Sequence, residues 1–292
     1  MRVKKIKTLG IIGVGLIGGS FALALKRQGL VEKVLGAGKD DNSLGLAKAL
    51  GIIDEVVTIA EMATLADVIV IAAPVNAFEG IANVLAPLLP ANTIVSDVGS
   101  TKAKIIEIAR KVFDNKIHQF IPAHPIAGSH ASGPTAAISD LFQDKNVIIT
   151  PLPENSSESV ALIQSLWESC GATVQLLKQA KDHDDIYAAV SHFPHFLAAC
   201  YMSFMESDPI RKQALNMGGT GFRDFTRIAA GSPEMWRDIF LSNQEAMLSQ
   251  MRDFEKEFNY FKQLLENKDA EQLYQWLSVA AKARQNWKVI KN

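Results

Sequence analysis

This chain has few cysteines, almost no net charge and no long apolar run. The two cysteines, Cys170 and Cys200, fit no metal-binding or C-x-x-C spacing, which favours buried free thiols in a reducing compartment. The 30 basic and 31 acidic residues leave a net charge of −1, which disfavours nucleic acids and anionic membranes as partners. No run of about 18 apolar residues occurs, and the basic Met1–Lys7 is followed by a glycine-broken stretch. The sequence therefore predicts a soluble cytoplasmic protein without a leader or a membrane span.

The length and composition of the chain suggest about two domains. With 292 residues and 48% hydrophobic content, the chain can bury a sizeable core in each of them. The hydrophobic pattern changes its period near Leu177–Lys181, and we find no internal repeat and no low-complexity linker. We therefore expect a first domain over residues 1–178 and a second domain over residues 179–292.

A glycine-rich motif near the N-terminus carries the strongest functional signal. The apolar run Leu9–Ile12 enters G-x-G-x-x-G, and a helix-compatible run begins at Phe21. In such a strand–turn–helix unit, the first glycine allows the tight turn and the second lets the backbone approach a pyrophosphate, while the third lets helix and strand pack closely. The phosphates are favoured at the helix N-terminus, where free N–H groups and the helix dipole meet them. The residues that we expect to contact a dinucleotide here are Gly13, Gly15, Leu16, Ile17 and Gly18.

The end of the second predicted strand, Lys33–Gly38, bears on which dinucleotide is bound. NAD-binding folds place an acidic residue there, about 20 residues past the glycines, to hold the ribose 2′-hydroxyl. This chain has Gly38 and Lys39 instead, and Lys39 with Ser43 is suited to a 2′-phosphate. We therefore expect NADP to be preferred, with NAD possible. The alternative is a solvated turn whose polar residues, from Asp40 to Ser43, only cap the helix that follows.

Strands and helices continue to alternate through the first half of the chain. This alternation predicts an α/β doubly wound parallel sheet, or Rossmann fold, with Asn146–Thr150 as its sixth strand and Thr173–Leu177 as its last. In such sheets the ligand lies beyond the carboxyl ends of the strands. The loops expected at the site are therefore Pro74–Val75, Gly99–Lys102 and His124–Ser129.

From Gln179 onward the strand signals stop and the chain has a helical period. The helices predicted there are Asp182–Glu206, Pro209–Met217, Pro233–Lys262 and Asp269–Asn286. The third of these carries a long apolar stripe from Trp236 to Phe261, and such a stripe must be covered. An all-helical domain can bury only part of it internally, so we expect a homodimer formed through these helices.

His124 is the first candidate for chemistry. It precedes Pro125 just after a predicted strand end, where a ligand is expected. Imidazole can take a proton from a hydroxyl as hydride leaves the same carbon, and its ordinary pKa predicts an ascending limb near about pH 6–7 in the rate profile. The alternative is a loop histidine with a purely structural role. Nearby, Ser100 and Lys102 are either further site residues or only a cap and a first-turn residue.

Two pairs of residues in the helical half also suggest a site. His192 and His195 lie three residues apart and can face one side of an interrupted helix, but they have no clear third metal ligand, so we expect no metal. Arg223 and Arg227 lie four residues apart and can bind carboxylates in forked geometry. The alternative for the arginines is an ordinary ion pair with a nearby surface aspartate.

A dinucleotide site, a candidate base and two arginines together suggest the oxidation of an anionic hydroxy compound. Motifs that follow in order over nearly the whole chain resemble the prephenate/arogenate dehydrogenases of tyrosine biosynthesis: G-x-G-L-I-G-G-S, A-A-P-V, D-V-G-S-x-K, H-P-I-A-G-S, S-H-F-P-H and G-F-R-D-F-T-R-I-A. The resemblance implies oxidative decarboxylation of prephenate or arogenate, in which hydride passes to the nicotinamide and the ring carboxylate leaves as CO2. The product is then 4-hydroxyphenylpyruvate or tyrosine.

The same resemblance implies roles for individual residues. His124 would deprotonate the ring hydroxyl, with Ser100 hydrogen-bonding nearby. The residues that it places around the substrate are Arg227, Arg223, Ser129 and His195. The further cofactor contacts that we expect are Lys39, Ser43, Pro74 and Val75.

One departure from the family pattern concerns His130, which stands where several relatives carry a glutamate and leaves the charge around the substrate side chain open.

We expect a stand-alone dehydrogenase, without a mutase or a regulatory module. Two other interpretations compete with it. A β-hydroxyacid dehydrogenase would carry G-x-x-x-K-x-x-x-N soon after the linker, and this motif is missing. A non-catalytic dinucleotide sensor would need the glycine loop but neither the histidine nor the arginines.

Overall fold

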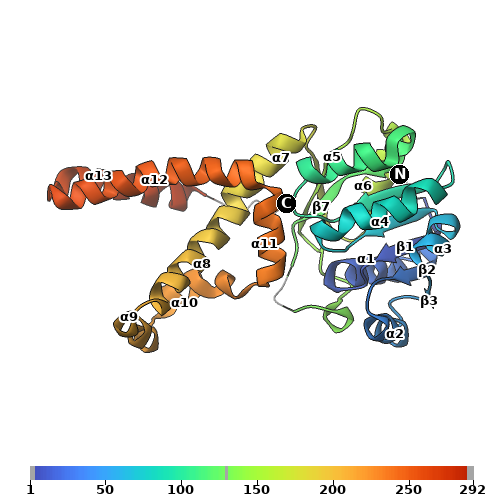
Figure 1. The fold of residues 1–292 in the computed structure, drawn as a ribbon, viewed down its shortest axis with the longest axis horizontal. Coiled ribbons are helices and arrows are strands. Elements are labelled where there is room, and N and C mark those ends of the chain that lie inside the picture. Colours follow the sequence, from blue (N-terminus) through green and yellow to red (C-terminus); the bar gives the residue numbers. More distant parts are fainter. Residues whose placement is uncertain (1–3, 129–130, 288–292) are drawn as a thin grey trace.

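A parallel sheet of six strands forms the centre of the first part of the chain in the computed structural model (Figure 1). The structure describes residues 4–128 and 131–287. The strand order is β3-β2-β1-β4-β5-β6, so the order reverses between β1 and β4. The strands are β1 (Ile6–Ile12), β2 (Val31–Ala37), β3 (Glu55–Val56), β4 (Val68–Ile71), β5 (Ile94–Asp97) and β6 (Phe120–Ile121). This topology confirms the predicted Rossmann-like sheet and places the expected ligand crevice at the carboxyl ends of β1 and β4.

Helices cover both faces of this sheet and form two separate apolar cores. On one face lie α1 (Leu16–Arg27), α2 (Asp41–Ala49) and α6 (Ser157–Ser169). On the other face lie α3 (Ile59–Leu65), α4 (Phe78–Leu85) and α5 (Ala103–Phe113). The short turns η1 (Val75–Ala77), η2 (Ala86–Leu88), η3 (Asp114–Gln119) and η4 (Pro134–Ala136) connect these elements. The continuous apolar sequence of β4 follows from this arrangement, because both faces of the strand are buried.

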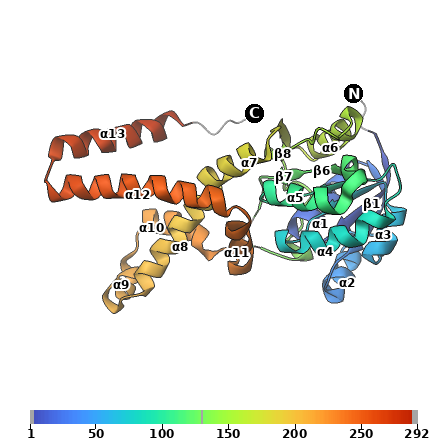
Figure 2. The same cartoon turned by 45° about the horizontal axis from the view of Figure 1, so that its top comes forward.

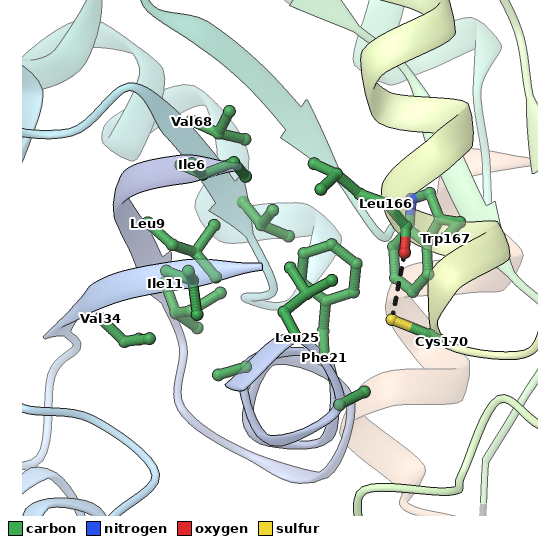
Figure 3. Packing of buried hydrophobic residues seen from close by; sticks show 14 of the residues in the cluster. Ile6, Leu9, Ile11, Phe21, Leu25, Val34, Val68, Leu166, Trp167 and Cys170 are labelled. Atoms are coloured by element: carbon green, nitrogen blue, oxygen red, sulfur yellow. Dashed lines mark hydrogen bonds between the residues drawn. The ribbon is translucent and has the colours of Figure 1, made fainter. Parts of the chain in front are cut away.

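Figure 3 shows the core between α1, α6 and the sheet. The rings of Phe21 and Trp167 lie 4.3 Å apart between their centroids and pack beside Leu9. Cys170 lies in the same core, donates a hydrogen bond to the carbonyl of Leu166 and has its pKa raised to about 12 by burial. The prediction of buried free thiols is therefore confirmed for Cys170. It is wrong for Cys200, which is exposed on α8 (Phe193–Glu206).

A second, smaller sheet departs from the expected pattern. It contains β7 (Ala123–Pro125), β8 (Asn146–Ile149) and β9 (Thr173–Leu176), with β7 antiparallel to β8 and β8 parallel to β9. The prediction that the last two strands complete the large parallel sheet is therefore wrong. The chain leaves the large sheet at β6 and enters the small one after Pro122, whose carbonyl accepts a hydrogen bond from the Thr150 N–H. Strand pairing of this kind joins distant segments and leaves no local signal in the sequence.

The second part of the chain is helical and extends away from the sheets, as Figures 1 and 2 both show. It contains α7 (Ala180–Tyr187), the π-helical turn η5 (Ala188–His192), α8, α9 (Pro209–Ala214), η6 (Leu215–Met217), α10 (Thr220–Thr226), η7 (Arg227–Ala230), α11 (Pro233–Ser242), α12 (Gln244–Glu266) and α13 (Ala270–Asn286). The helices α12 and α13 lie side by side as a long hairpin (Figure 2). Within the described residues, no helix is both long enough and apolar enough to cross a membrane.

The predicted continuous helix over Pro233–Lys262 is wrong, because the chain breaks at Asn243 between α11 and α12. The Asn243 side chain is buried and donates hydrogen bonds to the carbonyl of Asp184, at 2.8 Å, and to Nδ1 of His192, at 3.1 Å. The break therefore places Asn243, between α11 and α12, in contact with both α7 and η5. Its cause is a tertiary contact, which periodicity cannot reveal.

Candidate active site

The three glycines of the first loop have three different surroundings. Gly13 has a positive φ of 93°, and a Cβ there would lie 2.5 Å from the carbonyl oxygen of Ala72 at the end of β4. A Cβ on Gly18 would lie 2.5 Å from the Gly13 oxygen, because α1 packs closely on the loop. Gly15 is the N-cap of α1, and a Cβ there would meet nothing within 4 Å. The open space at the helix N-terminus fits the approach of a pyrophosphate.

The remaining cofactor candidates lie around the same crevice. Leu16 and Ile17 form the first turn of α1. Pro74 is the N-cap of η1 and Val75 its first residue, directly after the carboxyl end of β4. The helix α11 packs against η1, so the helical part of the chain closes over this edge of the sheet.

The end of β2 presents an exposed Lys39 and a capped helix. The Asp40 carboxylate accepts hydrogen bonds from the N–H groups of Asn42 and Ser43 and from the Ser43 hydroxyl. The hydroxyl bond, with the two backbone bonds, holds the pKa of Asp40 below its ordinary value. Asp40 therefore has a structural role as the N-cap of α2, which agrees with the alternative interpretation of this turn. Lys39 is exposed to solvent beside the strand end.

A buried ion pair fixes the strand that carries His124. The Asp97 carboxylate, at the carboxyl end of β5, pairs with the Lys102 ammonium, and both side chains are buried. Asp97 Oδ1 also accepts the N–H of Ala123 at 3.1 Å, and Lys102 Nζ donates to the Ala123 carbonyl at 2.7 Å. The Ala123 residue is thus held at both its N–H and its C=O, directly before His124. Lys102 was expected to be either a further site residue or a first-turn residue, and its side chain ties β5 to β7.

His124 itself is part of a buried hydrogen-bonded array that joins the two parts of the chain. Its Nδ1 lies 2.9 Å from Nε2 of His183 on α7, and His183 Nδ1 lies 2.8 Å from Oδ1 of Asp184. The same carboxylate accepts the N–H groups of Lys102 at 2.7 Å and Ala103 at 2.9 Å, at the start of α5. All three side chains of the array are buried. The sequence alone led us to single out neither His183 nor Asp184 as a site residue.

A helical period does contain a signal for these two residues. His183 and Asp184 precede Tyr187 and Ala188 by one helical turn, so the four side chains lie on one face of α7 and the start of η5, and all four are buried. The Tyr187 ring contacts His124, with centroids 4.9 Å apart, and His183, at 4.7 Å. Two polar residues on the apolar face of a helix indicate a buried polar site.

The surroundings of His124 favour its neutral form. Burial lowers the pKa of His124 well below its ordinary value of 6.5. Positive charge on His183, Lys102 or His192 lowers this pKa further. The ascending limb expected near about pH 6–7 is therefore corrected to lower pH in the free enzyme. A neutral imidazole at physiological pH has a lone pair with which to accept a proton.

The histidines of η5 and α8 lie next to this array. His192 is buried, and burial lowers its pKa to about 4. The His195 ring stacks on Trp236 of α11, with centroids 3.6 Å apart, and His195 Nδ1 lies 3.1 Å from the Ser191 carbonyl. The Trp236 ring contacts both His195 and His192, and Asn243 donates to His192 and to the Asp184 carbonyl, so a continuous set of contacts runs from His195 to His124.

The other candidate residues occupy the edges of this region. Ser100 lies half-buried in the loop after β5, next to Thr101, whose hydroxyl is 3.1 Å from that of Ser242 on α11. Arg223 lies on α10 with an exposed side chain 4.0 Å from Asp224, and Arg227 begins η7, which packs against α8. The predicted substrate residue Ser129, with His130, lies outside the described residues.

Comparisons with known proteins place this arrangement in a family. Residues 21–176 match the model of the prephenate dehydrogenase nucleotide-binding domain, and residues 179–279 match that of the prephenate dehydrogenase dimerization domain. The chain belongs to the prephenate dehydrogenase family. It is therefore an NAD(P)-dependent dehydrogenase, as its motifs predicted, and it carries a dimerization domain.

Individual relatives agree with this membership and differ in the substrate that they are named for. The chain is 32% identical to the cyclohexadienyl dehydrogenase of Zymomonas mobilis, over 95% of each chain. It is 34% identical to a crystal structure of prephenate dehydrogenase from A. aeolicus in complex with hydroxyphenyl propionate and NAD+, with a TM-score of 0.88 over 96% of this chain and 97% of that one. It is 28% identical to Synechocystis arogenate dehydrogenase, with a TM-score of 0.82 over 96% of this chain and 100% of that one.

Proposed function

We propose that this enzyme catalyses the oxidative decarboxylation of prephenate, arogenate or both, giving 4-hydroxyphenylpyruvate or tyrosine and CO2. The observation that carries the proposal is His124, a buried imidazole with a lowered pKa at the carboxyl edge of the strands, on the side where the glycine loop opens. Relatives named for prephenate, cyclohexadienyl and arogenate oxidation support this substrate class.

The reaction needs a base for the ring hydroxyl. When bound, the nicotinamide accepts hydride from the ring carbon that carries this hydroxyl. That carbon becomes carbonyl-like only as the hydroxyl proton leaves, so a neutral His124 assists the step by accepting the proton. Ser100, in the loop after β5, hydrogen-bonds to the same hydroxyl or to His124 in this proposal. Ser100 follows β5, and His124 lies on β7, which Asp97 holds at the carboxyl end of β5.

The substrate carboxylates need cationic partners from the helical part. Arg227 is the proposed partner of one carboxylate, with Arg223 supporting the anion site. His195 lines the pocket in this proposal, and its stacking on Trp236 fixes the ring orientation. Ser129 remains a prediction for the loop that follows His124.

NADP is the proposed preferred cofactor. The glycine loop, the first turn of α1, Pro74 and Val75 would hold the pyrophosphate and nicotinamide half. Gly38 leaves no carboxylate to take a free 2′-hydroxyl, and Asp40 is engaged as a helix cap. Lys39 is exposed next to the strand end and can meet a 2′-phosphate. Ser43 remains a proposed contact, although its hydroxyl already donates to Asp40.

A homodimer is the proposed state in solution, and the cytoplasm the proposed location. Large apolar side chains remain exposed on the hairpin of the last two helices: Phe254, Phe258, Leu265, Tyr274, Leu277 and Val279. A second copy would cover such a surface. Light scattering at micromolar concentration should give a mass near twice the 31.8 kDa of one chain, and a mass of one chain would contradict the dimer.

One assay tests the function. Prephenate and arogenate are each combined with NADP and with NAD, and reduced cofactor and CO2 are measured together. The proposal predicts equal amounts of both products with at least one substrate and a higher kcat/KM with NADP. Absence of turnover in all four combinations would contradict the proposed substrates, and a clearly higher kcat/KM with NAD would overturn the cofactor preference. Gly38→Asp should shift the preference toward NAD, because its carboxylate would repel a 2′-phosphate.

A further inference from the structure

We propose that His183 and Asp184 are positioning residues that hold His124 in one tautomer, with its proton on Nδ1 and its lone pair on Nε2. This inference rests on the proposed role of His124 as the base. A neutral imidazole has two tautomers, and only the one whose lone pair points to the substrate can accept its proton. The direction of each hydrogen bond in the array decides which tautomer is present.

The direction is fixed at the Asp184 end of the array. An ionised carboxylate can only accept, and this one already accepts the N–H groups of Lys102 and Ala103 at the N-terminus of α5. His183 must therefore place its proton on Nδ1 and donate it to Asp184 Oδ1. In neutral His183 the other nitrogen, Nε2, is then an acceptor. The contact of 2.9 Å between His183 Nε2 and His124 Nδ1 thus requires the proton on His124 Nδ1.

A charged His183 would reverse this arrangement, and its surroundings oppose that charge. Burial lowers the pKa of His183, and the nearby Lys102 ammonium lowers it further, while Asp184 acts in the opposite direction. The titratable and charged groups that face His124 and His183 from the surrounding elements are Asp97, Lys102, Asp184, Tyr187 and His192. Neutral His183 is the state that leaves His124 ready to accept a proton.

The array also accounts for the charge formed during the reaction. The hydroxyl proton of the substrate moves to His124 Nε2 as the O–H bond breaks and hydride leaves the ring carbon. The resulting imidazolium is stabilised through His183 by the carboxylate of Asp184. When the ring carboxylate leaves as CO2, its bonding electrons enter the ring, and the ring oxygen takes the proton back from His124. The base is thus regenerated with the phenol product.

The substitution Asp184→Asn tests the direction of the array. An amide has one acceptor oxygen for the three N–H donors that the carboxylate accepts. When its NH2 group faces His183 Nδ1, the His183 proton moves to Nε2 and forces the wrong tautomer on His124. We expect kcat to fall by about 10²–10⁴, with KM changed less than about threefold, since a misplaced tautomer affects the base and leaves substrate contacts intact. In the His124→Asn background the same substitution should lower kcat no further, because the two residues act as one unit.

A pair of substitutions at His183 separates positioning from packing. His183→Gln keeps an acceptor for His124 Nδ1, and His183→Leu keeps volume without one. We expect the glutamine variant to stay within about tenfold of the wild-type kcat and the leucine variant to lose about 10² or more. Equal kcat values in the two variants would overturn the proposal, as would a further large loss from Asp184→Asn in the His124→Asn background.

A measurement without substrate distinguishes this inference from the proposed function. Nitrogen-15 NMR of histidine-labelled enzyme at pH 7.5 reports the tautomer of each ring. The proposal predicts neutral His124 protonated on Nδ1 in the wild type and on Nε2 in the Asp184→Asn variant. A wild-type His124 protonated on Nε2 overturns the positioning role, whatever substrate the enzyme turns over. Missing turnover with the predicted NMR signals would instead overturn the substrate and leave the array established.

Discussion

The sheet-containing part of the chain and the helical part bury their apolar side chains to very different degrees. The first part has two large cores, one on each face of the six-stranded sheet. Among the described residues, the hydrophobic cluster of the second part has only four buried members, Ala188, Phe193, Ala246 and Met247. No side chain of α13 is fully buried. The first part is therefore stabilised mainly by its own packing, whereas the second leaves apolar surface for a partner.

The proposed active site lies where these two parts meet. His124 comes from the small sheet and receives its hydrogen-bond partner from α7, while Asn243 ties α11 and α12 to the same helix. In the proposed site, a packed scaffold thus supplies the base and the cofactor loop, and the more open helices supply the groups that orient the base. Substitutions in each of the two parts, and a change of pH, should therefore give effects of different kinds and sizes.

The largest effect on stability should come from the first core. Trp167→Ala removes a fully buried ring that packs on Phe21 and Phe142. We expect it to lower the free energy of unfolding by about 3–5 kcal/mol. The matched variant Trp276→Ala removes a half-buried ring that contacts only Phe261 among the ring pairs of the described residues. We expect it to lower the free energy of unfolding by about 0.5–1.5 kcal/mol. Urea unfolding at one fixed protein concentration measures both. Equal losses would show that the helical part is as tightly packed as the first.

The next effect concerns substrate binding by the helical part. Arg227→Ala should raise the substrate KM by about 30- to 4,000-fold, which corresponds to a loss of about 2–5 kcal/mol when a buried carboxylate loses its charged partner. Cofactor affinity should barely change, because the dinucleotide is held by the other part. Arg223→Ala is the control: this side chain already lies 4.0 Å from Asp224, so we expect a rise in KM below about tenfold. An unchanged KM for Arg227→Ala would remove this residue from the site.

A different effect should appear as acid weakens the junction between the two parts. His124, His183 and His192 are buried with pKa values below 6.5 in the folded chain, so their neutral forms are favoured there. Their contribution to stability is complete above about pH 6.5 and is lost as the pH falls toward the folded-state pKa values, by up to about 1.4 kcal/mol per pH unit for each histidine. For His192 this window extends down to about pH 4. Unfolding free energies between pH 7.5 and 4.5 test this, and His192→Gln should reduce the slope.

The sequence predicted best what local chemistry determines. The glycine loop follows from a local strand–turn–helix pattern, and the position of His124 follows from its place just after the carboxyl end of β6. The small sheet could not be predicted, because β7 pairs with β8 across an intervening loop of many residues. The break at Asn243 and the Lys102–Asp97 pair likewise depend on contacts between distant segments.

The array behind His124 shows the same limit in the site. The residues Lys181 to Asp185 contain several charged side chains, as a solvated helix start does. Two of these residues are buried only because α7 packs on the N-terminus of α5, where Asp184 accepts two backbone N–H groups. Helical period places them on the apolar face with Tyr187, but only the packed structure shows their partner. Chemistry that spans both parts of the chain is thus the least visible in its sequence.

The pH dependence of kcat/KM in the wild type and in His124→Asn tests the central claim most directly. With the substrate and cofactor that the enzyme prefers, the wild-type profile should have an ascending limb below pH 6.5, because His124 has a lowered pKa in the free enzyme. His124→Asn should lower kcat by about 10²–10⁴ and abolish that limb, with a smaller change in substrate binding. If the variant keeps a near-wild-type kcat and the same ascending limb, His124 is not the base, and His195 becomes the residue to test.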